Sequence, residues 1–316
     1  MRRLPVYFAM IIMPLISFAQ QEQMFTQFMF NKLAINPAFA GNENYLGFTA
    51  LLRDQWNGFP GSPKAQLLSV NLPRIGDRIG VGFNFRRQTV GITNSINYSG
   101  IYSYKFPLSN GTISMGLELS GRNLRMDFTD SRLLAIDGLE IDPSIPNQIV
   151  NKNLFNVGYG LYFNTRNYYF GASVPRLIKA DLDFDSNNVF SAEVRHLLLM
   201  GGAAFPIKED LSMTIQTMFR LAENSPFSTD MSVMFTLNEK YTGGLNYRFG
   251  GATGDIGESI ALLFSFQVTH NFMVGFAQEF TLSKIRTYDN GSLEIVLHYA
   301  FGKKKNKVVV INPRYF

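Results

Sequence analysis

Cysteine is absent from the 316 residues, and this absence excludes several classes of protein at once. A disulfide scaffold, a thiolate metal site, a cysteine nucleophile and a lipidated N-terminal cysteine all need a residue that the chain lacks. Long apolar runs are also lacking, because nothing after residue 20 reaches the ~20 consecutive apolar residues of a membrane-spanning helix. With a mean hydropathy of +0.00, the chain is not a bundle of membrane helices.

Residue patterns that carry catalysis or bind metals and cofactors are equally scarce. The three histidines, His196, His270 and His298, are far apart and share no metal-ligand spacing. No Gly-x-Ser-x-Gly nucleophile elbow is present, and the glycine-rich run at 250–254 lacks the lysine of a phosphate-binding loop. We therefore expect no catalytic residue, no metal site and no cofactor, and predict that the protein is not an enzyme.

The excess of positive charge is modest and is not gathered on one helix or arm. The chain carries 29 Lys+Arg against 24 Asp+Glu, for a formal charge of +5. The one dense run, four lysines within 303–307, lies almost at the C-terminus, where such runs are usually solvated tails. Nucleic acid is therefore not an expected partner.

The first residues have the pattern of an export signal. Arg2 and Arg3 precede an apolar stretch at 4–18, and small residues follow at Ser17 and Ala19, where a signal peptidase cleaves. A short membrane anchor is the alternative, but the stretch is short and Pro14 interrupts it. We expect a cleaved signal peptide, with a mature chain that begins near Gln20.

Beyond the signal, apolar residues recur at every second position, which is typical of strands with one apolar face. Within 292–301 the apolar face carries Leu293, Ile295, Leu297, Tyr299 and Phe301. The opposite face carries polar or small residues with one exception, a valine at 296. The same alternation occurs at 79–86, 112–120 and 211–220.

This pattern predicts about fourteen strands, an even number as bacterial outer-membrane barrels have. The predicted strands are 44–56, 64–75, 78–88, 94–106, 111–124, 153–164, 167–175, 194–206, 210–221, 229–238, 240–249, 257–268, 270–280 and 291–301.

The links between these strands alternate between short and long. Tight turns are expected at 74–78, 108–111, 164–167, 206–210, 237–240 and 269–270, and longer links at 57–63, 88–93, 125–152, 176–193, 222–228, 249–256 and 281–290. Outer-membrane barrels have short periplasmic turns and long outer loops. A soluble β-sandwich, the alternative, gives no reason for link lengths to alternate. We predict an all-β, transmembrane outer-membrane β-barrel.

The expected organisation follows from this topology. It comprises a signal peptide at 1–19, a short N-terminal periplasmic or lumenal plug segment at 20–42, a barrel at 43–302 and a basic periplasmic tail at 303–316. With an even strand count, both ends of the chain are expected in the periplasm. About fourteen strands enclose a bore wide enough that the N-terminal segment or the loops must plug it.

Specific motifs stand in the N-terminal third. Residues 21–32 read QEQMFTQFMFNK, residues 35–41 read INPAFAG, and residues 53–66 read RDQWNGFPGSPKAQ, with SVNLP at 69–73. These stretches closely resemble the PorP/SprF family of the Bacteroidota type IX secretion and gliding apparatus, which shows "FSQYMFN…NPAYAG" and "R-x-Q-W-x-G-F-x-G-A-P-x-T-Q". Thr26, Phe28, Phe39, Ser62 and Ala65 depart from that pattern. The ending NPRYF at 312–316 is also similar to a family ending.

The resemblance implies an outer-membrane protein that assists export and surface attachment of a large adhesin with a C-terminal sorting domain. Expected partners are that adhesin, other type IX secretion subunits and outer-membrane lipid. A passive porin for small solutes is the alternative function. A porin needs an open, polar lumen. Many positions expected to face inward hold small residues, and the charged Arg86, Lys105, Glu118 and Arg220 stand beside them. This pattern fits both an open and a filled lumen.

Three segments are candidate contact sites. The loop at 55–64, with Trp56 and Phe59 between Gly and Pro residues, is expected to be rigid and packed, either as a partner surface or as a lumen cap. Its candidate residues are Arg53, Gln55, Trp56, Gly58, Phe59, Gly61 and Pro63. The N-terminal segment, with a short helix expected at 24–31, has the candidates Phe25, Gln27, Phe28, Phe30, Asn31, Asn36 and Pro37. The tail has the candidates Arg314, Tyr315 and Phe316 as a docking peptide.

Overall fold

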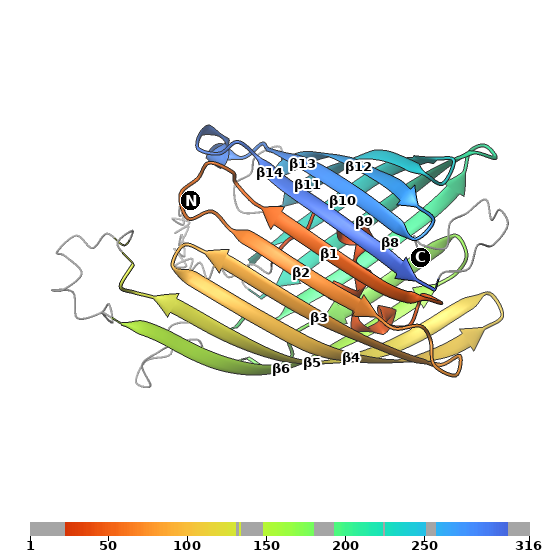
Figure 1. Ribbon diagram of the computed structural model, residues 1–316, viewed down its shortest axis with the longest axis horizontal. Coiled ribbons are helices and arrows are strands. Elements are labelled where there is room, and N and C mark those ends of the chain that lie inside the picture. Colours follow the sequence, from red (N-terminus) through yellow and green to blue (C-terminus); the bar gives the residue numbers. More distant parts are fainter. Residues whose placement is uncertain are drawn as a thin grey trace, which may run out of the picture.

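The computed structural model describes residues 23–130, 133, 148–179, 193–223, 225–250 and 257–302. Its strands form a closed antiparallel barrel in which each strand pairs with its neighbours in sequence and β1 pairs with β14 (Figure 1). Among these residues no helix is long and apolar enough to cross a membrane.

All fourteen predicted strands are present in the described part of the chain, and the predicted fold class is confirmed. The strands are β1 Leu46–Asp54, β2 Lys64–Asn71, β3 Ile79–Val90, β4 Thr93–Leu108, β5 Gly111–Asp127, β6 Ile149–Asn164, β7 Tyr168–Val174, β8 His196–Pro206, β9 Leu211–Ala222, β10 Ser225–Leu237, β11 Tyr241–Gly250, β12 Ser259–Thr269, β13 Phe272–Thr281 and β14 Ser292–Phe301.

Burial along the strands follows the period of two read from the sequence. In β14, Leu293, Leu297 and Tyr299 are exposed on the outer face, whereas Glu294 and Val296 are buried in the lumen. An outer face of exposed large apolar side chains is stable only against lipid, because it could not stay in water without aggregating. Closure of the sheet gives the backbone groups within the lipid their hydrogen-bond partners.

The predicted strict alternation of link lengths is wrong at two places. The β3–β4 link is only Gly91 and Ile92, and β9 and β10 are separated by residues 223 and 224. The β3–β4 ladder continues to the pair Val90–Thr93, so the hairpin is paired to its tip. Gly91, at φ +55°, adopts the left-handed conformation that this tight turn needs. Side-chain polarity alone does not mark where a ladder stops once strands leave the lipid.

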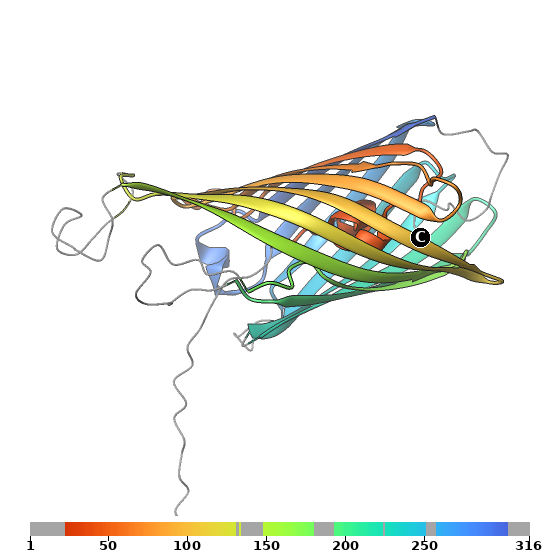
Figure 2. The same ribbon diagram turned by 90° about the horizontal axis from the view of Figure 1, so that it is seen from below.

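The strands differ in length, and the barrel has an uneven outline. At the long-loop end, where β1, β3 and β5 end, β5 and β6 project past the ends of the other strands (Figures 1 and 2). On their outer faces the continuous run of large apolar side chains stops at Leu119 of β5 and Phe155 of β6, and mostly polar residues follow, with Ile149 at the very start of β6 as the exception. The projecting part therefore lies outside the lipid.

The segment before β1 lies inside the lumen (Figure 2). It contains three short 3-10 helices rather than the single helix expected at 24–31: η1 Phe28–Phe30, η2 Lys32–Ala34 and η3 Pro37–Phe39. A fourth, η4 Lys284–Thr287, lies in the β13–β14 link. Buried aromatic and aliphatic side chains on η1 to η3 replace water in the bore.

The expectation that the N-terminal segment lies at the periplasmic end is wrong for the residues that the structure describes. The Thr26 backbone N–H binds Glu294 at the start of β14, so this part of the chain lies at the long-loop end. Gly41 meets Gly80 near the short-turn end, from which β1 starts. The segment thus crosses the whole lumen, from the long-loop end at Thr26 to the short-turn end at Gly41. Strand count fixes where β1 begins, not the path of the residues before it.

Candidate functional site

The lumenal segment 23–42, called the plug below, packs directly onto the backbone of the barrel wall. A Cβ placed on Gly116 of β5 would lie 2.2 Å from the Ala38 nitrogen, and one on Gly80 of β3 would lie 2.0 Å from the Ala40 oxygen. Only glycine permits such close approach of two backbones. The small inward residues of the wall are therefore seats for the plug rather than the lining of an open channel.

Polar side chains add specific bonds between plug and wall. Asn36 Nδ2 donates to the Leu161 oxygen at 2.8 Å and to the Ala172 oxygen at 3.3 Å, while Asn36 Oδ1 accepts from the Ala38 N–H and caps η3. From the wall, Ser173 Oγ donates to the Ile35 oxygen and Ser103 Oγ to the Ala40 oxygen, both at 2.7 Å. These bonds satisfy plug carbonyls and amides that water does not reach.

Apolar contacts reach opposite sides of the wall. One cluster joins the η2–η3 side of the plug to β4, β6, β7 and β8, and its members are Leu33, Ala38, Phe39, Ala40, Ile101, Tyr162, Tyr169, Met200 and Ala204. A second joins η1 to β9, β10, β12 and β13, and its members are Phe28, Met29, Met218, Met234, Leu263 and Ala277. Phe30 and Ile35 pack against both clusters, so the plug fills the bore from side to side.

A group of buried charges holds the plug at the long-loop end. Glu294 accepts from the backbone N–H groups of Thr26 and Gln27, at 2.6 and 3.0 Å, and pairs with Arg53 of β1. Glu279 of β13 accepts from the Thr26 hydroxyl at 2.6 Å and pairs with Arg53 at 3.2 Å. The first turn of the plug is thus bound by two carboxylates of the wall.

Two further wall residues extend this group, which we call the charge cluster. Arg248 of β11 lies 2.9 Å from Asp230 and 3.2 Å from Glu279, and Arg220 of β9 also pairs with Asp230. The cluster holds three arginines and three carboxylates, namely Arg53, Arg220, Arg248, Asp230, Glu279 and Glu294. Because burying ions costs much of what their pairing returns, such a cluster favours one arrangement more than it adds stability.

Lys32 is a buried cation of the plug itself, outside the membrane-spanning strands. Its Nζ lies 4.2 Å from the ring centroid of Tyr169 and 5.8 Å from that of Phe39. Burial lowers the pKa of Lys32 to about 7, and the nearby Glu43 carboxylate limits the fall. The aromatic faces stabilise the charge that remains.

A second ion group fixes the start and the end of the β7–β8 link. Glu193 pairs with Arg122 of β5 and lies 3.4 Å from Arg176. Asn156 of β6 donates to Glu193 at 3.1 Å and also binds both backbone groups of Ile178. The residues after β7 are therefore held over the lumen rather than in line with the wall.

The β1–β2 loop is tied to both of its neighbours around the rim. Asn57 exchanges backbone bonds with the β13–β14 link, donating to Gly291 at 2.7 Å and accepting from Asn290 at 2.8 Å. On the other side, the Gly91 N–H donates to the Gly61 oxygen at 2.9 Å. Within the loop, Trp56 adopts φ +53°. These bonds hold the loop along the rim, with Phe59 40% exposed.

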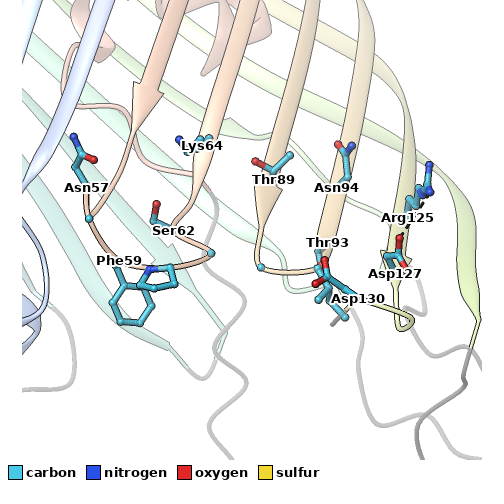
Figure 3. Close-up of a pocket in the computed structure, with 15 residues that line it drawn as sticks. Asn57, Phe59, Ser62, Lys64, Thr89, Thr93, Asn94, Arg125, Asp127 and Asp130 are labelled. Atoms are coloured by element: carbon cyan, nitrogen blue, oxygen red, sulfur yellow. Dashed lines mark ion pairs between the residues drawn. The ribbon is translucent and has the colours of Figure 1, made fainter. Parts of the chain in front are cut away.

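A groove of about 580 Å³ lies beside this loop. Figure 3 shows residues of the loop on one side and the ends of β3, β4 and β5 on the other. Backbone, amide, hydroxyl and charged groups line it: Asn57, Gly58, Phe59, Pro60, Gly61, Ser62, Lys64, Thr89, Gly91, Ile92, Thr93, Asn94, Arg125, Asp127 and Asp130.

The candidate residues fall into three groups. The β1–β2 loop, called the rim loop below, carries Gln55, Trp56, Gly58, Phe59, Gly61 and Pro63. The plug carries Phe25, Gln27, Phe28, Phe30, Asn31, Asn36 and Pro37. Arg53 had been grouped with the loop, but its side chain is buried in the lumen because it takes an inward position near the end of β1. Arg314, Tyr315 and Phe316 lie outside the described residues.

Sequence reasoning did not single out Asp230, Arg248, Glu279 or Glu294. All four lie in predicted strands, at positions that the period of two assigns to the lumenal face. The signal for these four residues is a charged side chain at a lumenal position of a strand whose other lumenal positions are mostly small. Their association across four strands, by contrast, depends on barrel register and on the path of the plug.

A closed wall of fourteen strands with an apolar outer face and a filled lumen defines a plugged outer-membrane β-barrel. The sequence model of the family described as "Type IX secretion system membrane protein PorP/SprF" matches residues 17–299. The chain belongs to this family, and the predicted resemblance and outer-membrane location are confirmed.

Solved barrels of other kinds resemble the fold at low identity. They include a TodX deltaS2S3 mutant monoaromatic hydrocarbon channel, 12% identical with TM-score 0.49, covering 86% of this chain and 94% of that one. The Acinetobacter baumannii outer membrane protein Omp33 is 9% identical with TM-score 0.43, covering 83% and 99%. The Ralstonia pickettii toluene transporter TbuX is 12% identical with TM-score 0.47, covering 88% and 93%. No curated protein matches the sequence.

Proposed function

We propose that this protein is an accessory and anchoring component of the type IX secretion and gliding machinery. It holds an exported adhesin that carries a C-terminal sorting domain, through protein contacts at the cell-surface end of the barrel, and it also contacts other subunits of the machinery. Outer-membrane barrels have short turns in the periplasm, which puts the rim loop and its groove at the surface.

The observation that carries the proposal is the seated plug. A porin needs a water-filled bore, whereas here the plug packs against glycines of the wall and binds wall carboxylates. A barrel filled in this way acts by binding other proteins rather than by passing solutes. The rim loop, held on both sides and bordered by a groove, supports the surface end as the contact region.

Two measurements test this function. Purified protein in planar bilayers is expected to give no stepwise conductance, while deletion of the gene is expected to release one adhesin from the cell surface without changing permeability to small solutes. Robust solute flux, or full adhesin retention in the deletion strain, would contradict the proposal.

A substitution locates the contact. Phe59→Ala removes an exposed ring at the surface end and is expected to lower adhesin retention, because aromatic side chains often anchor interfaces. Ile75→Ala is the matched control, since Ile75 is 51% exposed in the β2–β3 link at the opposite end. Equal loss with both variants, at equal barrel amounts, would argue against contact at the rim.

A further inference from the structure

At the long-loop end, part of one edge of β6 pairs with no strand among the described residues. β6 is 16 residues long, but β7 has only 7 and pairs with β6 only from Tyr159 to Asn164. The chain then turns over the lumen, and the Val157 oxygen accepts the last backbone bond from this side, from the Leu177 N–H at 2.9 Å. Among the described residues, no strand continues along β6 beyond this point.

The open groups can be named from the ladder pattern. In an antiparallel strand the N–H and C=O of one residue point to the same neighbour, and successive residues alternate. Because the Val157 oxygen faces the β7 side, so do the backbone groups of Phe155, Asn153, Asn151 and Ile149. The residues between them face β5, with which β6 is paired throughout.

This edge lies at the cell surface rather than in lipid. On the outer face of β6, Phe155 is followed by the polar Asn153 and Asn151, and β5 changes likewise from Leu119 to Asn123. The one further apolar residue on this face, Ile149, lies opposite Asp127 at the tip. The start of β6 projects from the barrel together with the end of β5 (Figure 2). An open edge in the hydrocarbon region would be too costly, but one in water is available for pairing.

An apolar patch lies at the base of the edge. Phe155 is 72% exposed, and Leu177 and Ile178, which flank it where the chain turns inward, are 40% and 49% exposed. Backbone groups that need partners, next to exposed apolar side chains, are what an added strand uses: the ladder gives affinity and the side-chain contacts give specificity.

We propose that the β6 edge from Ile149 to Phe155 is a docking site for an extended strand of the exported partner, which pairs with it as an additional β-strand. This rests on the proposed function and names the mode of contact. Among the described residues, the sheet at this end carries the cations Arg87 of β3, Arg125 of β5 and Lys152 of β6 against the carboxylates Asp127 and Asp130, and this excess of positive charge favours a strand with acidic side chains. Two copies of this chain paired edge to edge would bring these cations together, and like charges oppose that pairing.

Asn153 offers a sharp test because its N–H faces the open edge. Asn153→Pro removes that donor and places a ring on the open side, while the β5–β6 bonds are kept. Asn153→Ala is the control, since it changes the same side chain and keeps the donor. Both variants lose the bond that Asn123 Nδ2 donates to Asn153 Oδ1, so this loss cancels in the comparison.

The experiment compares these variants with the gene deletion in cells, with the adhesin released by the deletion as the readout. Asn153→Pro is expected to lower adhesin retention about tenfold relative to Asn153→Ala, as the loss of an edge hydrogen bond and a steric block would do. Heat-modifiable migration shows that both barrels are folded. Full retention with Asn153→Pro would overturn the docking edge. Full retention in the deletion strain would instead overturn the proposed function.

A photo-crosslinker at position 153 identifies the occupant, with position 123 on β5 as the paired-strand control. A product at 153 that contains the same adhesin, and is weaker at 123, supports the proposal. If position 153 crosslinks only to a second copy of this chain, or only to a protein other than the adhesin, the choice of partner is overturned. Equal products at 153 and 123 overturn the edge as the site.

Discussion

Single side chains on the lumenal face determine how the plug is held. Arg248 neutralises both Asp230 and Glu279, and its side chain is 2% exposed. Removing one member of a buried ion group leaves the charges of the others uncompensated. This lowers the stability of the fold more than replacing the whole group with apolar residues would.

Arg248→Met is therefore expected to lower the free energy of unfolding by about 3–5 kcal/mol. Unfolding in urea, followed by loss of heat-modifiable migration, measures it. Arg87→Met is the control, because Arg87 is an exposed arginine on the outer face of β3, and its removal should change stability by less than about 0.5 kcal/mol. Equal effects would mean that the cluster does not hold the barrel.

Lys32 makes the stability of the plugged state depend on pH. Its pKa falls from 10.5 to about 7 on folding because of burial, so between these values the unfolded chain holds a proton that the folded chain releases. Stability contributed by this group therefore rises with pH across that window, by at most about 1.4 kcal/mol per pH unit, and is lowest below pH 7.

Melting temperatures of wild type and Lys32→Met, measured from pH 7 to 10 in steps, check this expectation. The variant should melt higher near pH 7, and the difference should shrink as the pH rises. A constant difference across the window would show that Lys32 keeps one protonation state in both folded and unfolded chains.

At the scale of elements, the seat of η3 on β5 couples the plug to the wall. Gly116→Val would force the Ala38 backbone away from β5, because its Cβ would lie 2.2 Å from the Ala38 nitrogen. Displacement of η3 is expected to lower the melting temperature and to produce conductance steps in planar bilayers, where we expect none from the wild type.

Gly100→Val provides the matched control on the neighbouring strand β4. A Cβ on Gly100 meets nothing within 4 Å, so the same change in strand propensity occurs without touching the plug. Conductance with both variants would indicate general damage to the wall. Absence of conductance with Gly116→Val would show that the plug can shift without opening a path for ions through the lumen.

For the whole molecule, the sequence predicted the wall far better than its contents. Period two reports only which face of a strand meets lipid, and residues such as Leu117 and Leu119 therefore marked β5 correctly. The same period is silent on what the other face meets. Gly116 read as a small lumenal residue, and only the path of the plug shows it to be a seat for Ala38.

The open β6 edge was beyond sequence reasoning for a related reason. β7 was predicted at 167–175 and ends at Val174, so its length was anticipated. That β6 begins at Ile149, several residues before the predicted start at 153, was not, because Asn151 and Lys152 lack an apolar alternation. Pairing outside the membrane follows backbone register, which polarity does not record.

The pairing of Arg53 with Glu294 bears on the order in which the molecule is made. These two residues are register partners at the seam where β1 meets β14, and Glu294 also accepts the N–H groups of Thr26 and Gln27. The earliest part of the chain and its last strand therefore complete one another. A barrel closed around an empty bore would leave the Glu294 carboxylate without these two donors. Pairing of β1 with β14 is therefore most favourable once the plug is inside the barrel. A chain without its plug would close and assemble more slowly.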